Sequence, residues 1–225
     1  MLFRSRVLCY WRDRVPDAIG RFKKLVADSN PRVRLEAVRG ASFFRDAAAA
    51  DIALAALKQP TDYYLEYCMK ESLRQLEPLW RKAINEGKPV AADNPAGIDY
   101  LIRSVSTAEL LKLPRTPKVL EAILVRPEVP DNDRSLALAA LALQRKTTRV
   151  TELLSALEQS KSTTLARLLP WEDPAELKAA RERVAALART GSTPELRQSG
   201  WAALARGDDS FDAAWTEASK SPASL

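Results

Sequence analysis

The side chains that could serve as a general acid or base in this 225-residue chain are four aspartates: Asp13, Asp17, Asp93 and Asp99. Nothing in the sequence pairs them, and single aspartates of this kind commonly cap helices or face solvent. The chain has no histidine, which removes the commonest general base and the usual haem, copper and zinc ligand. Its seven glycines are scattered singly and form no phosphate-binding loop. The sequence therefore predicts no catalytic residue, no metal site and no cofactor.

The two cysteines, Cys9 and Cys68, form neither a CxxC nor a CxxCH pair. Lone cysteines in helical sequence are most often small buried apolar residues. A disulfide between the two stays open as an alternative.

Aromatic and basic residues gather in the N-terminal part of the chain. The segments CYWRDR and DYYLEY contribute five aromatic side chains: Tyr10, Trp11, Tyr63, Tyr64 and Tyr67. Residues 1–50 hold eleven Lys and Arg against five Asp and Glu, so the net charge of +6 comes entirely from this part. Such residues can pack in a core, form a protein interface or stack on bases, and a basic helical face can simply be solvated.

From this cluster we take a candidate interaction surface of five residues: Trp11, Arg12, Arg14, Tyr63 and Tyr64. The expected partner is a protein in preference to a nucleic acid. No membrane span is expected, because the longest apolar runs, such as IALAAL at 52–57, are far too short.

The elements that must position these residues are helices. Ile19, Phe22, Leu25 and Val26 have the spacing of one helical face. Similar patterns predict helices over 17–27, 31–44, 46–58, 63–80, 97–105, 107–113, 117–125, 131–146, 149–160, 173–190, 193–207 and 209–220. Residues 85–97 are predicted to be a loop, and alternating β-branched runs are missing, so the expected class is all-α.

The segment DSNPRVRLEAVRGASFF, residues 28–44, predicts a structural elbow between two helices. Pro31 suits the first helical position, where its missing N–H costs nothing. We expect the carboxylate of Asp28 to bond Arg34 across the turn. Ala37 is small enough to let a neighbouring helix approach closely.

The elbow pattern recurs along the chain. An arginine followed three positions later by a small residue appears as Arg34/Ala37, Arg134/Ala137 and Arg197/Gly200, with Leu65/Cys68 as a looser copy. The intervals of 31, 69 and 63 residues correspond to one, two and two periods of a helix pair. Two packed helices cannot bury their apolar faces alone, so such pairs stack. The sequence predicts an α-solenoid of stacked antiparallel helix pairs with partly degenerate repeats.

The elbow segment closely resembles the signature of HEAT repeats. A wider resemblance rests on VLCYWRDRVPDAI, RVRLEAVRGASFF, DYYLEYCMKESLRQLEPLW, the stretch from ADNPAG to RPEVPD and the closing AAWTEASKSPASL. These segments resemble the HEAT region of large membrane-bound or secreted bacterial dehydrogenases, described chiefly from planctomycetes and verrucomicrobia. In that family a sugar-dehydrogenase-like propeller precedes the HEAT region, and a c-type cytochrome segment and in some members a blue-copper module accompany it.

The resemblance implies a periplasmic or other extracytoplasmic setting and a role as a non-catalytic spacer that docks redox domains. A freestanding HEAT adaptor for a protein partner is the alternative. A HEAT-like DNA-binding protein or alkyl-base DNA glycosylase is a more distant one.

The expected organisation is a lead at 1–5, N-terminal helix pairs at 6–84, the loop at 85–97 and C-terminal helix pairs at 98–225. Leu2 to Ser5 match the translated tail of a sequencing adapter, so Met1–Ser5 are expected to be non-native, although an ordinary basic N-terminus is the alternative. WTEASKSPASL has no helix stop, which suggests a fragment. No signal peptide is recognisable, and neither end carries a convincing polar cap, so we expect exposed apolar surface at one or both ends.

Overall fold

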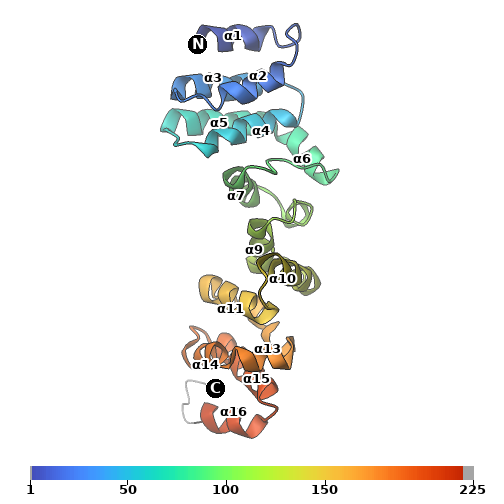
Figure 1. Cartoon of the computed structure of the whole chain (residues 1–225), viewed down its shortest axis with the longest axis vertical. Coiled ribbons are helices and arrows are strands. Elements are labelled where there is room, and N and C mark those ends of the chain that lie inside the picture. Colours follow the sequence, from blue (N-terminus) through green and yellow to red (C-terminus); the bar gives the residue numbers. More distant parts are fainter. Residues whose placement is uncertain (1, 220–225) are drawn as a thin grey trace. The chain divides into compact units, whose positions relative to one another are not determined.

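The computed structural model describes residues 2–219, which consist of helices joined by turns and loops (Figure 1). These residues form sixteen α-helices and two short 3-10 helices and contain no strand, so the predicted all-α class is confirmed. No helix within them is both long and apolar enough to cross a membrane. Met1, part of the expected non-native lead, and residues 220–225 of the expected abrupt end lie outside the described residues.

The chain divides into two compact units between Val119 and Leu120. The helices of the first unit are α1 (Leu2–Tyr10), α2 (Ala18–Leu25), α3 (Pro31–Ala41), α4 (Ala48–Ala55), η1 (Ala56–Lys58), α5 (Tyr63–Gln75), α6 (Glu77–Asn85), α7 (Pro95–Ser104) and α8 (Thr107–Leu110). Helix α9 (Pro117–Val125) spans the division. The second unit continues with α10 (Asp131–Arg145), α11 (Arg149–Ser160), α12 (Thr163–Ala166), η2 (Leu169–Trp171), α13 (Pro174–Ala179), α14 (Arg181–Thr190), α15 (Pro194–Gly207) and α16 (Phe211–Ala218).

Side-chain caps start many of these helices where the sequence predicts a start. Asn30 accepts a hydrogen bond from the N–H of Arg32 at 3.0 Å, and Pro31 occupies the first turn of α3. Asp62 caps α5 in the same way through the N–H of Leu65 at 2.8 Å. Caps of this kind satisfy backbone donors that the helix itself leaves free.

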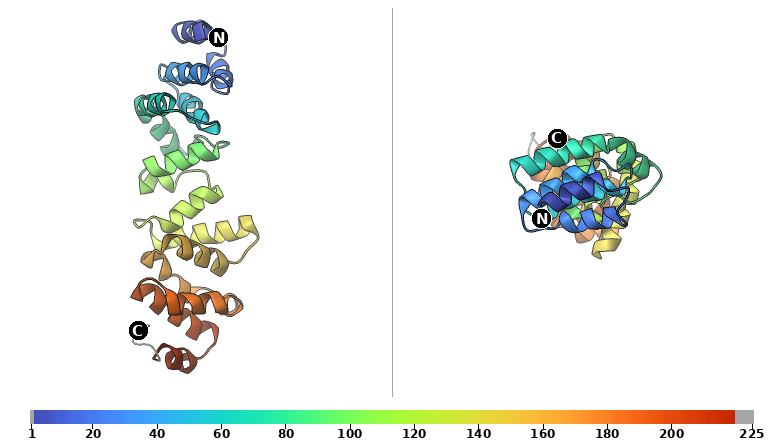
Figure 2. Two further views of the ribbon diagram at one scale, coloured as in Figure 1. Left: turned by 90° about the vertical axis from the view of Figure 1, so that its left-hand side faces the viewer. Right: turned by 90° about the horizontal axis from the view of Figure 1, so that it is seen from above.

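In the first unit, α2 with α3 and α4 with α5 form two successive layers (Figures 1 and 2). Phe22 of α2 and Ala37 of α3 are fully buried between them. Ser72 of α5 donates a hydrogen bond to the carbonyl of Val38, which ties α5 directly to α3. Layers of this kind bury the apolar stripes that single helices would leave in water.

The predicted loop at 85–97 is shorter than expected and is held against α4. Asn94 is buried; its side chain donates to the carbonyl of Leu54 at 2.8 Å and caps α7 through the N–H of Gly97. Asp51 accepts a hydrogen bond from the N–H of Ala91 at 2.7 Å. The segment therefore lies inside the first compact unit.

Two predicted helices are interrupted, and two α-helices, α1 and the four-residue α12, were not predicted. The helix expected over 63–80 breaks at Leu76, and α6 starts before Pro78, which has no N–H to continue the preceding ladder. The helix expected over 173–190 breaks at Ala180. Helix α1 was missed because its segment has no apolar stripe of helical period.

In the second unit, arginine side chains join segments that are separated in the sequence by one or more helices. Arg149 of α11 bonds both carboxylate oxygens of Glu172, and Arg183 of α14 bonds Glu158 of α11. Gly200 of α15 lies so close to α14 that a Cβ there would approach the backbone of Ala188 to 2.7 Å. Together with the Ser72–Val38, Asn94–Leu54 and Asp51–Ala91 contacts, these hydrogen bonds join residues 23 to 40 positions apart.

Candidate protein-interaction surface

The predicted elbow residues lie where two layers of the first unit meet. Arg34 is only 4% exposed, and its guanidinium donates to the carbonyls of Asp28 and Ser29, both at 3.1 Å. It also donates to the side chain of Gln59 and to the carbonyl of Pro60, at 3.1 and 2.7 Å. The Arg34 side chain thus bonds the turn that precedes its own helix and links that turn to the one that precedes α5.

The expected role of the Asp28 carboxylate is wrong. This carboxylate accepts from the N–H of Asn30 at 2.8 Å, and the backbone carbonyl of Asp28 serves Arg34 instead. A guanidinium presents five donors in a rigid fork, so it can satisfy several carbonyls of one tight turn at once.

The later copies of the pattern use the same carbonyl-binding geometry. Arg134 is 1% exposed and donates to the carbonyls of Arg126 and Pro127, both at 2.9 Å. Arg197 donates to the carbonyl of Gly191 at 2.9 Å. All three arginines therefore bind the turn that precedes their own helix, which is a packing role.

The N-terminal aromatic residues are not core residues, so that interpretation is wrong. All five are exposed by more than half of their surface: Tyr10 80%, Trp11 56%, Tyr63 76%, Tyr64 72% and Tyr67 61%. The spacing of these residues resembles a buried stripe, but the buried stripe of α5 consists of Leu65, Met69 and Leu73. The tyrosines occupy the opposite side of the helix.

Helices α1, α3 and α5 lie side by side and present these side chains together. Arg6 of α1 bonds Glu36 of α3 at 2.7 Å, and Cys68 of α5 lies 3.8 Å from the carbonyl of Leu35 on α3. Arg39, on the exposed side of α3, interacts electrostatically with Cys9 and with Cys68. We define the tyrosine–arginine face by nine selected exposed residues of α1, of α5 and of α3 with the turn that follows it: Tyr10, Arg32, Arg39, Phe43, Tyr63, Tyr64, Tyr67, Lys70 and Arg74. Glu66 of α5 is exposed as well and accepts a hydrogen bond from Thr61.

The predicted surface residues are divided between two places. Tyr63 and Tyr64 belong to the tyrosine–arginine face, with ring centroids 5.5 Å apart in edge-to-face contact. Arg12 lines a groove of about 260 Å³ between α1 and α3, together with Tyr10 and Arg39. Trp11 instead lines a groove between α1 and α2, and neither tyrosine contributes to that groove. Arg14 is exposed in the turn between α1 and α2.

The face carries more positive than negative charge. Glu36 forms an ion pair with Arg6, and Glu71 forms one with Arg74 at 2.8 Å, so both carboxylates already have a cationic partner. Arg32 and Lys70 have no ion pair among residues 2–219. Neither cysteine forms a disulfide, and burial raises the pKa of the Cys9 and Cys68 thiols, which disfavours the reactive thiolate.

The four aspartates considered for acid or base chemistry are not gathered in one place. Asp17 caps α2 by accepting from the N–H of Gly20 at 3.1 Å. Asp93 borders a pocket of about 430 Å³ between α2, α4 and the 85–97 segment, which also contains Asp51. Burial raises the pKa of Asp51. Within residues 2–219, no cluster of three or more histidine, cysteine, aspartate or glutamate side chains is arranged to hold a metal ion.

The sequence reasoning missed the contribution of α3 to this surface. Arg32, Arg39 and Phe43 follow the i, i+7, i+11 spacing of one helical face, opposite the buried Val33 and Ala37. That spacing can be recognised in the sequence. Whether these α3 residues lie near Tyr67 depends on how α3 packs against α5. Comparison of the chain with protein-family models, curated proteins and solved structures finds no match.

Proposed function

We propose that the chain is a non-catalytic helical scaffold that binds a protein partner through the tyrosine–arginine face. The observation that carries the proposal is the exposure of Tyr63, Tyr64 and Tyr67 beside a row of arginines. Tyrosine and arginine dominate the energetically important parts of protein interfaces, because each offers a large contact area and a hydrogen-bonding group. A monomeric protein gains nothing from leaving three neighbouring tyrosines in water.

The proposed architecture behind this face is a HEAT-like α-solenoid of antiparallel helix pairs with partly degenerate repeats. Its support is the layering of α2 with α3 and α4 with α5, and the shared carbonyl-binding geometry of Arg34, Arg134 and Arg197. In such a stack the inner helix of each pair lines a continuous surface. Helices α1, α3 and α5 would be those inner helices.

The proposed setting is a large extracytoplasmic dehydrogenase, in which the chain spaces and docks the redox domains. This part rests on the family resemblance of the sequence. Reading the source DNA on both sides of the coding region tests it. A propeller-encoding region upstream and a CxxCH motif downstream are expected, and native start and stop codons at residues 1 and 225 would contradict it.

Binding can be tested with the propeller region encoded upstream, expressed separately. Tyr63→Ala with Tyr67→Ala should weaken its binding at least tenfold, because buried tyrosines at interfaces typically contribute ~2 kcal/mol or more. Leu143→Ala is the matched control: this second-unit residue is 81% exposed, and its loss should leave the affinity unchanged.

Titration with single-stranded DNA over a salt series separates the nucleic-acid alternative. A scaffold for proteins should bind DNA weakly and with a shallow salt dependence. Tight binding that falls steeply with salt and is abolished by the tyrosine substitutions would replace the proposed function with base stacking on the same face.

A further inference from the structure

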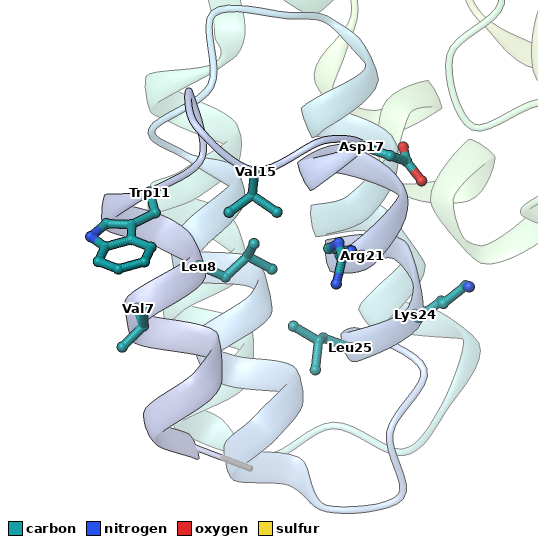
Figure 3. Close-up of a pocket in the computed structure, with 8 residues that line it drawn as sticks. All are labelled: Val7, Leu8, Trp11, Val15, Asp17, Arg21, Lys24 and Leu25. Carbon is teal, nitrogen blue, oxygen red and sulfur yellow. The ribbon is translucent and has the colours of Figure 1, made fainter.

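The groove between α1 and α2 is an apolar surface with a basic edge. Its volume is about 670 Å³, and Leu8, Val15 and Leu25 point into the space between the two helices (Figure 3). Val7 and Trp11 stand at its outer edge, 48% and 56% exposed. For a chain whose ends carry no convincing polar cap, the sequence analysis predicts exposed apolar surface of this kind.

The charges around this groove are mainly positive. Arg21 and Lys24 line it from α2, and Lys24 has no carboxylate partner among the described residues. Asp17 also borders the groove, but its carboxylate accepts the N–H of Gly20 as the cap of α2. An occupant of the groove must therefore combine apolar side chains with negative charge.

Helix α16 in the second unit has the complementary character. Phe211 and Trp215 lie one helical turn apart, are 68% and 53% exposed, and stack with ring centroids 5.9 Å apart. Asp209 and Asp212 are exposed beside them and have no ion pair within residues 2–219. The other two nearby carboxylates, Asp208 and Glu217, are already paired with Arg181 and Arg189.

We propose that α16 of one copy of the chain docks into the α1–α2 groove of another copy. Phe211 and Trp215 would enter the apolar groove, and the two free aspartates would face Arg21 and Lys24. An amphipathic helix with aromatic residues one turn apart is a common occupant of such grooves. Because different surfaces meet, the contact is heterologous, and copies can add without limit unless the geometry closes a ring.

Charge disfavours the symmetric alternatives. Pairing groove with groove would bring two sets of α2 cations together, and pairing α16 with α16 would bring two sets of free aspartates together. The contact is also small, one eight-residue helix against one groove, so association should be weak and dependent on concentration. It does not use the tyrosine–arginine face and is independent of the proposed function.

Two variants of exposed residues test the contact by sedimentation of the full chain from micromolar to millimolar concentration. The groove variant carries Trp11→Ser and Lys24→Glu, and the helix variant carries Trp215→Ser and Asp212→Asn. The parent chain should show a mass that rises with concentration and falls with added salt. Each variant alone should be monomeric, whereas their equimolar mixture should form a dimer and nothing larger, since each variant keeps one intact surface.

A control variant removes a matched aromatic residue and a matched cation elsewhere, with Tyr67→Ser and Lys70→Glu on α5. It should associate like the parent chain, and circular dichroism should show the same helix content for all four proteins. A parent chain that stays monomeric at every concentration would overturn the proposal. So would single variants that still associate, or a mixture that stays monomeric.

Discussion

Among the described residues, the first unit leaves more of its cations without an ion pair than the second unit does. In the second unit, Arg149, Arg183 and Arg189 each bond a carboxylate 23 to 28 residues away, so their charge joins one helix to another. In the first fifty residues the cations outnumber the carboxylates, and Arg14, Arg32 and Lys24 have no ion pair among the described residues. Ion pairs between helices occur in the first unit too, as Arg6–Glu36 and Arg81–Glu109 show, but these three unpaired cations of the first unit remain available to a partner.

Among the substitutions considered, replacing an elbow arginine should reduce the free energy of unfolding most, in the first unit at Arg34 and in the second at Arg134. Arg134→Met keeps an apolar stem but removes the bonds that the buried guanidinium makes to Asp131 and to the carbonyls of Arg126 and Pro127, so we expect a loss of about 2–4 kcal/mol in the free energy of unfolding. Arg34→Met should cost at least as much, because Arg34 serves four acceptors. Urea unfolding measures both.

The control for this experiment is Arg167→Met. Arg167 bonds the same Asp131 as Arg134 but is largely exposed, so its loss should cost less than about 1 kcal/mol. Equal losses for Arg134 and Arg167 would show that burial of the elbow arginine is unimportant.

At a close contact between helices, replacing glycine by alanine should destabilise the second unit more than the first. Gly200→Ala would place a Cβ against the backbone of Ala188, and we expect a loss of about 1–3 kcal/mol. Gly40→Ala meets the ring of Phe22 at 2.3 Å, and a side chain can move where a backbone cannot. The midpoint of thermal unfolding should fall further for Gly200→Ala, and the reverse order would contradict this comparison.

The helix that carries the tyrosines depends on its cap more than α16 does. Asp62→Ala removes the acceptor for the N–H of Leu65 and should cost about 1 kcal/mol. Ser210 precedes α16 but its side chain makes no cap bond, so Ser210→Ala should be close to neutral. Hydrogen exchange at the first turn of each helix reports the two effects separately.

The smallest expected effect is a dependence on pH in the first unit. Burial opposes ionisation of Glu109, but bonds from Arg81 and Ser106 outweigh it, so its pKa lies below the ordinary value of 4.5. A lowered pKa stabilises the fold above pH 4.5, and this contribution disappears as the pH falls through the value in the folded state. Glu109→Gln should therefore reduce the free energy of unfolding at neutral pH and make its further decrease in acid smaller.

Glu195 in the second unit provides the comparison. A bond from its own backbone N–H and one from Thr193 lower its pKa too, but its side chain is exposed. Glu195→Gln should change the acid limb of the unfolding curve less than Glu109→Gln does. A larger change for Glu195 would contradict the role assigned to the bonds from Arg81 and Ser106.

Local signals predicted most of the helices, because caps and prolines act within one turn. Asn30 before Pro31 and Thr193 before Pro194 mark starts that the structure has at the same positions. The breaks at Leu76 and Ala180 were missed, since the apolar period continues through them. The sequence named Tyr63 and Tyr64 as candidates for an interaction surface but left a core role open for them. It could not show that Arg39 completes their surface, because that depends on the packing of α3 against α5.

The short reach of the hydrogen bonds between helices has a mechanical consequence. The hydrogen bonds between helices described above join residues at most 40 positions apart, so few contacts must break before a short segment can leave. A chain stretched from both ends in an optical trap should therefore lengthen in several small steps at modest force. A single large rupture would mean that distant segments bear the load together.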